Sequence, residues 1–189
     1  MKRIGVWCGT NVDDTVVMGG APFRFLNYPQ KLYDEYNVRG VINLCEEYKG
    51  PNKEYEDLGI EELWLPTTDH FEPEFDDLVK AVEFIQSYKD ALHGDDDNVN
   101  DEYDEDEEKK ETDQLVSKKK GRVYVHCRAG HGRSAAVVFA WLLSQEEDID
   151  NVDMKKLNEM LCDKRNVRKT LWKQKNINQF RSWLHIGRK

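Results

Sequence analysis

The stretch at 123–142 constrains the fold most, because it joins a short apolar run to an apolar helical run through a tight loop. The run Val-Tyr-Val-His at 123–126 has the pattern of a buried strand, and the residues from Ser134 onward have helical spacing. The loop between them reads Cys-Arg-Ala-Gly-His-Gly-Arg at 127–133. A strand that leads through a short loop into a helix is typical of α/β proteins, in which helices pack on a sheet.

Further segments of both kinds alternate along the chain. Short apolar runs bounded by Gly, Pro, Asp or charged residues predict strands at 15–18, 38–44, 62–65 and 123–126. Helical spacing of apolar residues predicts helices at 28–36, 75–92, 134–144, 154–161 and 177–186. This alternation predicts an α/β fold with a small sheet flanked by helices. At 189 residues, we expect residues 1–189 to form a single domain.

One segment, at about 94–120, differs from the rest in composition. It carries 12 acidic and 5 basic residues, and therefore contributes most of the chain's net charge of −9. Between Asp95 and Asp113, the only sizeable apolar residues are Val99 and Tyr103, too few to offset the entropy of ordering. We predict a disordered acidic insertion on the surface, which is either inert or a docking or autoinhibitory element.

Cysteine spacing and charge exclude several classes of protein. The four cysteines, at 8, 45, 127 and 162, lack the paired short spacings of a zinc site or a disulfide framework. We therefore expect an intracellular protein with no metal and no cofactor. No basic stripe with interleaved aromatic residues is present, so no nucleic-acid partner is expected. No apolar run is long enough to span a bilayer, and no presequence is visible, which favours the cytoplasm.

The loop at 127–133 has the composition of an anion-binding site. Its glycines allow successive backbone N–H groups to point at one anion, and the following helix adds positive potential. In this setting we expect the pKa of Cys127 to fall below its usual value of about 8.5, which gives a thiolate at neutral pH. Arg133 can bind two phosphate oxygens through its planar guanidinium group. We predict that Ser134 hydrogen-bonds the sulfur and that His126 fixes the loop.

These residues predict attack of Cys127 on a phosphorus atom, followed by hydrolysis of the phosphocysteine. The leaving oxygen needs a proton donor, and the attacking water needs a base. Asp69 is the candidate for both roles, since it follows a predicted strand in a loop that can stand over a pocket; His70 is the rival donor. The predicted phosphate-binding residues are Arg128, Ala129, Gly130, His131, Gly132, Arg133 and Ser134.

The pattern His-Cys-x5-Arg-Ser with an upstream Asp resembles the signature of the dual-specificity branch of the protein-tyrosine phosphatase superfamily. Stretches at 17–22, 38–44, 46–48 and 65–69 resemble its mitochondrial subgroup that dephosphorylates phosphatidylglycerophosphate. The resemblance implies a central mixed sheet flanked by helices, Cys127 as nucleophile, Arg133 as phosphate ligand and Asp69 as general acid. Glu47 and Tyr48 are further candidates, because they resemble a motif beside the pocket of that subgroup.

Three functions remain open from the sequence. The subgroup resemblance favours a phosphatase for phosphatidylglycerophosphate or a related phospholipid, with peripheral contact with a membrane. The superfamily alone implies a phosphatase for phosphotyrosine, phosphoserine or phosphothreonine in proteins. A phosphate-binding module without activity is disfavoured, because nucleophile, arginine and acid are all present. The expected partner is thus a phosphorylated lipid or a phosphoprotein. The resemblance implies the mitochondrion, whereas the lack of a visible presequence favours the cytoplasm. The sequence makes no prediction of oligomeric state.

Overall fold

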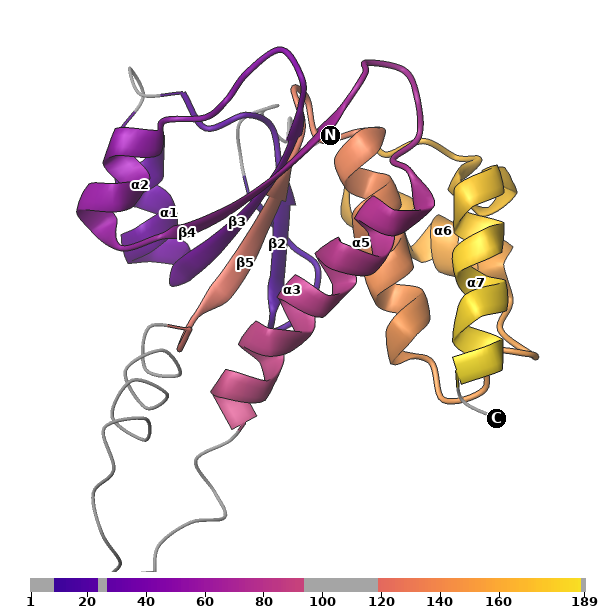
Figure 1. Cartoon of the computed structure of the whole chain (residues 1–189). Helices are drawn as coiled ribbons and strands as arrows, with labels where there is room; N and C mark the ends of the chain where they lie inside the picture. The colour runs from indigo at the N-terminus through magenta and orange to yellow at the C-terminus, as the bar shows by residue number, and fades with distance from the viewer. Residues whose placement is uncertain (1–8, 24–26, 94–118, 188–189) are drawn as a thin grey trace, which may run out of the picture.

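The computed structural model describes residues 9–23, 27–93 and 119–187 (Figure 1). In chain order its elements are β1 (Thr10–Asn11), β2 (Val16–Gly19), α1 (Tyr28–Tyr36), β3 (Val38–Cys45), α2 (Asn52–Leu58), β4 (Glu61–Thr67), α3 (Phe75–His93), β5 (Arg122–His126), α5 (Arg133–Gln145), α6 (Met154–Lys164), the 3₁₀ helix η2 (Leu171–Lys173) and α7 (Lys175–Gly187). The predicted acidic insertion lies outside the described residues, except for Lys119 and Lys120.

A five-stranded sheet forms the centre of the molecule, with the strand order β1-β2-β5-β3-β4. The short strand β1 is antiparallel to β2, whereas the remaining neighbours pair in parallel. The predicted α/β fold with a central mixed sheet is therefore confirmed. Because β2, β5, β3 and β4 run in one direction, the loops that follow them lie at the same edge of the sheet.

Helices cover both faces of the sheet, so its central strands are buried on both sides (Figure 1). Val123 and Val125 belong to the larger core, which includes residues of α3, α5, α6 and α7. Tyr124, between them in the sequence, belongs to a second core with residues of α1 and α2. This alternation follows from the two-residue period of a strand and explains why β5 reads as a continuous apolar run.

The helix α5 occupies the centre of the larger core. Its residues from Ala135 to Ala140 are all fully buried, and Trp141 donates a hydrogen bond from Nε1 to Asp13 Oδ2 at 2.7 Å. Packing on this scale fixes where α5 begins, and hence the position of the loop before it. None of the helices within 9–23, 27–93 and 119–187 is long and apolar enough to cross a membrane.

Every predicted strand and helix is present, with ends that differ by at most three residues. The helix α2 was not predicted, because its sequence is mostly polar and Tyr55 is its one buried residue. The elements β1 and η2 were also missed, since two or three residues are too short to show a periodic pattern.

Candidate active site

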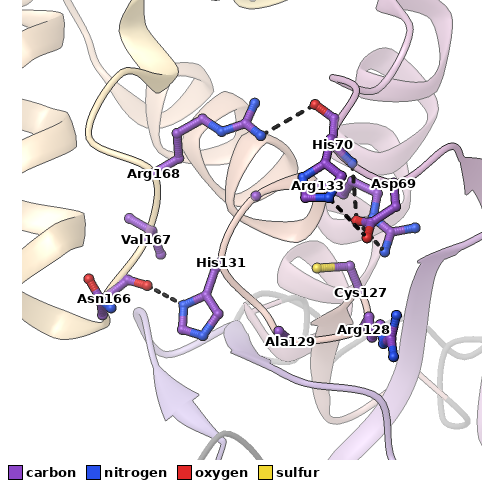
Figure 2. A pocket seen from close by; sticks show the side chains of 11 residues that line it. Asp69, His70, Cys127, Arg128, Ala129, His131, Arg133, Asn166, Val167 and Arg168 are labelled. Atoms are coloured by element: carbon purple, nitrogen blue, oxygen red, sulfur yellow. Dashed lines mark hydrogen bonds and ion pairs between the residues drawn. The ribbon is translucent and has the colours of Figure 1, made fainter.

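A loop at 127–132 connects the carboxyl end of β5 to the start of α5 and curls around the sulfur of Cys127 (Figure 2). Gly130 has a φ of +74°, and a Cβ atom there would lie 2.4 Å from the carbonyl oxygen of Gly19. A side chain is therefore excluded by the backbone conformation and by this close approach. The N–H of Gly130 points at the Cys127 sulfur, with 3.3 Å between nitrogen and sulfur.

Arg165, directly after α6, holds the outer side of this loop. Its guanidinium group is buried, and it donates from Nε to the carbonyl of Gly130 at 3.0 Å and from Nη2 to the carbonyl of Ala129 at 3.1 Å. In a trans peptide, the N–H of Gly130 points away from the carbonyl of Ala129. Binding of that carbonyl from outside therefore aims the N–H of Gly130 at the inside of the loop.

Cys127 is buried, with 4% of its surface exposed. Its sulfur lies 3.3 Å from the hydroxyl oxygen of Ser134 and accepts the N–H of Gly130. Burial is the largest single influence and opposes ionisation. Hydrogen bonds from Ser134 and Gly130, together with the charge of Arg133, outweigh burial and lower the pKa of the Cys127 thiol. The site therefore favours a thiolate more than water does.

Arg133, in the first turn of α5, is held rigidly beside this sulfur. Its terminal nitrogens donate to the two carboxylate oxygens of Glu47 at 2.8 and 2.7 Å, and Nη1 also donates to the carbonyl of Thr67 at 2.8 Å. The bidentate hydrogen bond raises the pKa of Arg133 and lowers that of Glu47 to about 2. Both groups are therefore charged at neutral pH, and the plane of the guanidinium group is fixed.

Asp69 lies in the loop after β4 and reaches the same guanidinium group. Its Oδ1 is 3.0 Å from Arg133 Nη2, and its side chain is about half exposed. His70 lines the same cavity, but 90% of its side chain is exposed, and its Nε2 is 3.8 Å from Asp69 Oδ2. The carboxylate of Asp69 is thus paired with Arg133. Its role as proton donor, with His70 as the rival, stays a prediction.

His126 ends β5 as a fully buried side chain that stacks on Tyr124, with 5.7 Å between ring centroids. Burial lowers the pKa of His126 to about 3, although a contact with the Cys127 backbone acts in the opposite direction. The imidazole is therefore uncharged at neutral pH and cannot serve as an acid there. Its role in fixing the loop stays a prediction.

The remaining predicted residues differ in how they relate to the cavity, which has a volume of about 460 Å³. It is lined by Asp69, His70, Cys127, Arg128, Ala129, His131, Gly132, Arg133, Asn166, Val167 and Arg168 (Figure 2). Gly130 and Ser134 do not line the cavity, but both contact the sulfur of Cys127. Tyr48 is not among the lining residues, and its hydroxyl donates to the carbonyl of Pro22 at 3.1 Å. Within the described ranges, no cluster of three or more His, Cys, Asp or Glu side chains could hold a metal ion.

The segment at 165–168 contributes to the site but was not identified from the sequence. Arg168 donates its backbone N–H to the carbonyl of His131 at 2.8 Å, and His131 Nδ1 contacts the carbonyl of Asn166. The signal available was a pair of arginines, Arg165 and Arg168, that lie a few residues beyond the predicted helix at 154–161. Such a pair is usually solvated, and nothing local shows that it packs against a loop more than 30 residues earlier.

Comparisons with known proteins agree with this geometry. The family model described as "Dual specificity phosphatase, catalytic domain" matches residues 94–183. A Homo sapiens protein named "Phosphatidylglycerophosphatase and protein-tyrosine phosphatase 1" is 33% identical over 138 residues, which are 70% of this chain and 54% of that protein. An Arabidopsis thaliana protein named "Phosphatidylglycerophosphate phosphatase PTPMT2" is 33% identical over 138 residues, 71% of this chain and 47% of that protein. The chain thus spans about half the length of these curated relatives.

Among solved structures, "Crystal Structure of PTPMT1 in complex with PI(5)P" is similar over nearly the whole chain. The TM-score is 0.68 and the sequence identity is 25%, with 96% of this chain and 99% of that chain covered. The similarity in fold therefore extends over nearly all of the chain.

Proposed function

We propose that this chain, which belongs to the dual-specificity branch of the protein-tyrosine phosphatase superfamily, hydrolyses phosphomonoesters through a phosphocysteine on Cys127. The favoured substrate is phosphatidylglycerophosphate or a related phospholipid. One observation carries the chemistry: the Cys127 thiol, whose pKa is lowered, lies in an open cavity beside a guanidinium group fixed by Glu47. A nucleophile and a phosphate ligand are thus held together before substrate arrives.

In the first step, the phosphate of the substrate binds to the loop N–H groups and to Arg133. It competes with Asp69 for Arg133 Nη2, and this frees the Asp69 carboxyl group to approach the leaving oxygen. The sulfur of Cys127 forms a bond to phosphorus while the bond from phosphorus to the leaving oxygen breaks. Protonated Asp69 transfers its proton to that oxygen, which leaves as an alcohol.

In the second step, water hydrolyses the phosphocysteine. Asp69, now a carboxylate, accepts a proton from the water while the oxygen of that water bonds to phosphorus. The bond from sulfur to phosphorus breaks, and the electron pair returns to Cys127 as a thiolate. The hydroxyl of Ser134, 3.3 Å from the sulfur, stabilises that departing thiolate, and inorganic phosphate is released.

The choice of a lipid rests on the subgroup resemblance and on the basic character of the cavity. Both curated relatives described above are named for phosphatidylglycerophosphate chemistry. Arg128 and Arg168 line the cavity in addition to the catalytic arginine, which suits a substrate with more than one negative group. The same resemblance supports a mitochondrial location with peripheral contact with a membrane, and the cytoplasm is the alternative.

A phosphoprotein is the second candidate substrate. The human relative is also named a protein-tyrosine phosphatase. The cavity is lined by His70, whose side chain is 90% exposed, so it is accessible from the protein surface.

Phosphate release from phosphatidylglycerophosphate vesicles and from a phosphotyrosine peptide tests the proposal. The wild-type protein should release phosphate at least about tenfold more efficiently, by kcat/KM, from the lipid. The Cys127→Ser variant should release none from either substrate, because a hydroxyl is a far weaker nucleophile at neutral pH. Preference for the peptide would assign the second candidate substrate instead. Activity retained by the Cys127→Ser variant would contradict the mechanism.

A further inference from the structure

The rim of the cavity carries a cation, Arg168, that takes no part in the two proposed chemical steps. Arg168 comes from the segment between α6 and η2, and its side chain reaches across to the carbonyl of His70, with Nη2 3.3 Å from that oxygen (Figure 2). A Cβ atom built on Gly132 would lie 3.6 Å from the same nitrogen. The guanidinium group of Arg168 therefore lies directly beside the phosphate-binding loop.

The backbone of Arg168 is fixed in this position from two sides. Its N–H donates to the carbonyl of His131 in the loop at 2.8 Å, and its carbonyl accepts from Asn158 Nδ2 of α6 at 3.1 Å. The imidazole of His131 in turn contacts the carbonyl of Asn166. Arg168 is thus placed by a network that includes the phosphate-binding loop itself.

The charge of Arg168 is not neutralised by an acidic side chain. Among the residues that the structure describes, the polar contact of its side chain is the uncharged carbonyl of His70. Arg133 differs, because it is paired with Glu47 and Asp69. A guanidinium group has five N–H donors in a planar fork, so Arg168 keeps donors for an anion at the cavity mouth.

We propose that Arg168 binds a second anionic group of the substrate, the phosphodiester of a phospholipid head group. This inference rests on the proposed function. Phosphatidylglycerophosphate carries a terminal phosphomonoester and, across a glycerol, a phosphodiester. When Arg133 holds the monoester at Cys127, the phosphodiester extends toward the rim, where Arg168 lies. The cavity of about 460 Å³ has room for more than one phosphate group. A glycerol phosphomonoester lacks the phosphodiester and so has no group for Arg168 to bind. Arg168 should therefore favour phosphatidylglycerophosphate over such a monoester.

Three variants and three substrates separate the role of this charge from other effects. Arg168→Ala removes the side chain. Arg168→Gln removes the charge but keeps an amide donor for the carbonyl of His70. Lys169→Ala is the matched control, because Lys169 is an adjacent exposed cation that lines a different surface cavity with Cys162 and Glu159. Circular dichroism verifies that each variant is folded.

The substrates are phosphatidylglycerophosphate in vesicles, its deacylated water-soluble head group, and glycerol 3-phosphate. The first two contain the phosphodiester, and the third has only the monoester with a comparable alkyl leaving group. We expect Arg168→Ala and Arg168→Gln to lower kcat/KM by about 10- to 100-fold for the first two substrates, as for loss of a charge-assisted hydrogen bond. The effect on glycerol 3-phosphate should stay below about threefold, and Lys169→Ala should match the wild type throughout.

Each other result overturns the subsite. An equal loss on all three substrates would show that Arg168 positions the loop at His70. A loss on vesicles alone would show attraction to an anionic lipid surface, since the deacylated head group keeps the phosphodiester. An unchanged kcat/KM on every substrate would show that Arg168 does not contribute to substrate binding. The proposed function is read separately, from the wild type: lack of activity on both phosphodiester substrates would overturn it together with the subsite.

Discussion

Cys127 and Cys45 lie at the carboxyl ends of neighbouring parallel strands, yet their surroundings shift their ionisation in opposite directions. β5 leads directly into Cys127, and β3 ends at Cys45. Both side chains are buried, with exposed fractions of 4% and 0%. Burial raises the pKa of Cys45 to about 12, and the carboxylate of Glu47 adds to this effect. The pKa of Cys127 is lowered instead.

Burial disfavours both thiolates, so the difference arises from the hydrogen-bond donors and charges around each sulfur. Cys45 is part of a strand, where its N–H donates to Asn43 Oδ1 at 2.9 Å and its carbonyl accepts from Trp64 at 2.8 Å. Among the described residues, no hydrogen-bond donor reaches its sulfur. Cys127 has left the strand, so the loop and the first turn of α5 direct donors at its sulfur. The turn from strand to helix thus places these donors at the Cys127 sulfur.

The largest expected effect is on turnover. Cys127→Ser should lower the rate with p-nitrophenyl phosphate by at least about 10⁴-fold, as for loss of a catalytic nucleophile. Cys45→Ala should keep the rate within about threefold, because Cys45 does not line the cavity. Steady-state kinetics on the two folded variants measure both. Equal losses would erase the functional distinction between the cysteines.

Glu47→Gln should have the next largest effect, because Glu47 pairs with Arg133 beside Cys127 and also raises the pKa of Cys45. The substitution removes the bidentate partner of Arg133, so kcat/KM should fall by about 10- to 100-fold. It also removes a charge that raises the pKa of Cys45, so that pKa should fall. Kinetics and the pH dependence of Cys45 alkylation measure the two changes. Unchanged kinetics would show that Thr67 and the fold orient Arg133 without Glu47.

Ser134→Ala should have a smaller effect that is confined to Cys127. The hydrogen bonds of Ser134 lower the pKa of Cys127, so loss of the hydroxyl should raise it. Because the thiolate is the proposed nucleophile, the acidic limb of the pH profile of kcat/KM should move to higher pH. We expect a loss of about tenfold below neutral pH and less above it. A profile that keeps its shape would show that the backbone donors suffice.

The smallest effect is on stability: the two thiols should change the free energy of unfolding in opposite directions as pH rises. The folded pKa of Cys127 is below the reference value of 9.0, so its contribution is present above pH 9 and is lost as pH falls through the folded pKa. The folded pKa of Cys45 is raised to about 12, so its contribution is present below pH 9 and is lost as pH rises toward 12. Each slope is at most about 1.4 kcal/mol per pH unit.

Urea unfolding between pH 7 and 10 measures these slopes. Relative to the wild type, Cys45→Ala should be comparatively more stable as pH rises above 9, because the variant lacks the thiol that resists ionisation. In the wild type, the Cys127 thiol should make stability rise as pH increases toward 9, and Cys127→Ala should lack this rise. Parallel curves for both variants would show that the two sites do not differ in their coupling to folding.

Local patterns predicted most of the fold and the centre of the site. The strand, loop and helix around Cys127 are contiguous in the sequence. The spacing of apolar residues predicts the strand and the helix, and the glycines indicate the loop between them. Long elements such as α3 were predicted for the same reason. The short helix α2 was not, because one buried residue, Tyr55, gives no period.

Residues that act through tertiary contacts were harder to predict. The hydrogen bond from Arg133 to Glu47 joins positions 86 residues apart, and Glu47 was identified only through a family resemblance. Arg165 and Arg168 reach the loop from the segment after α6, and an arginine in that segment looks like an ordinary surface cation. Contacts of this kind depend on how α6 packs on α5, which one sequence does not specify.

Trapping of the phosphorylated intermediate tests most directly that Cys127, and not its buried neighbour, is the nucleophile. In Asp69→Asn protein, p-nitrophenolate still leaves without much protonation, but the water that hydrolyses the phosphocysteine lacks its base, so the intermediate should accumulate. After a denaturing quench with radiolabelled p-nitrophenyl phosphate, peptide mapping should place the label on Cys127 and none on Cys45. Label on any other residue, or none while turnover continues, would contradict the account.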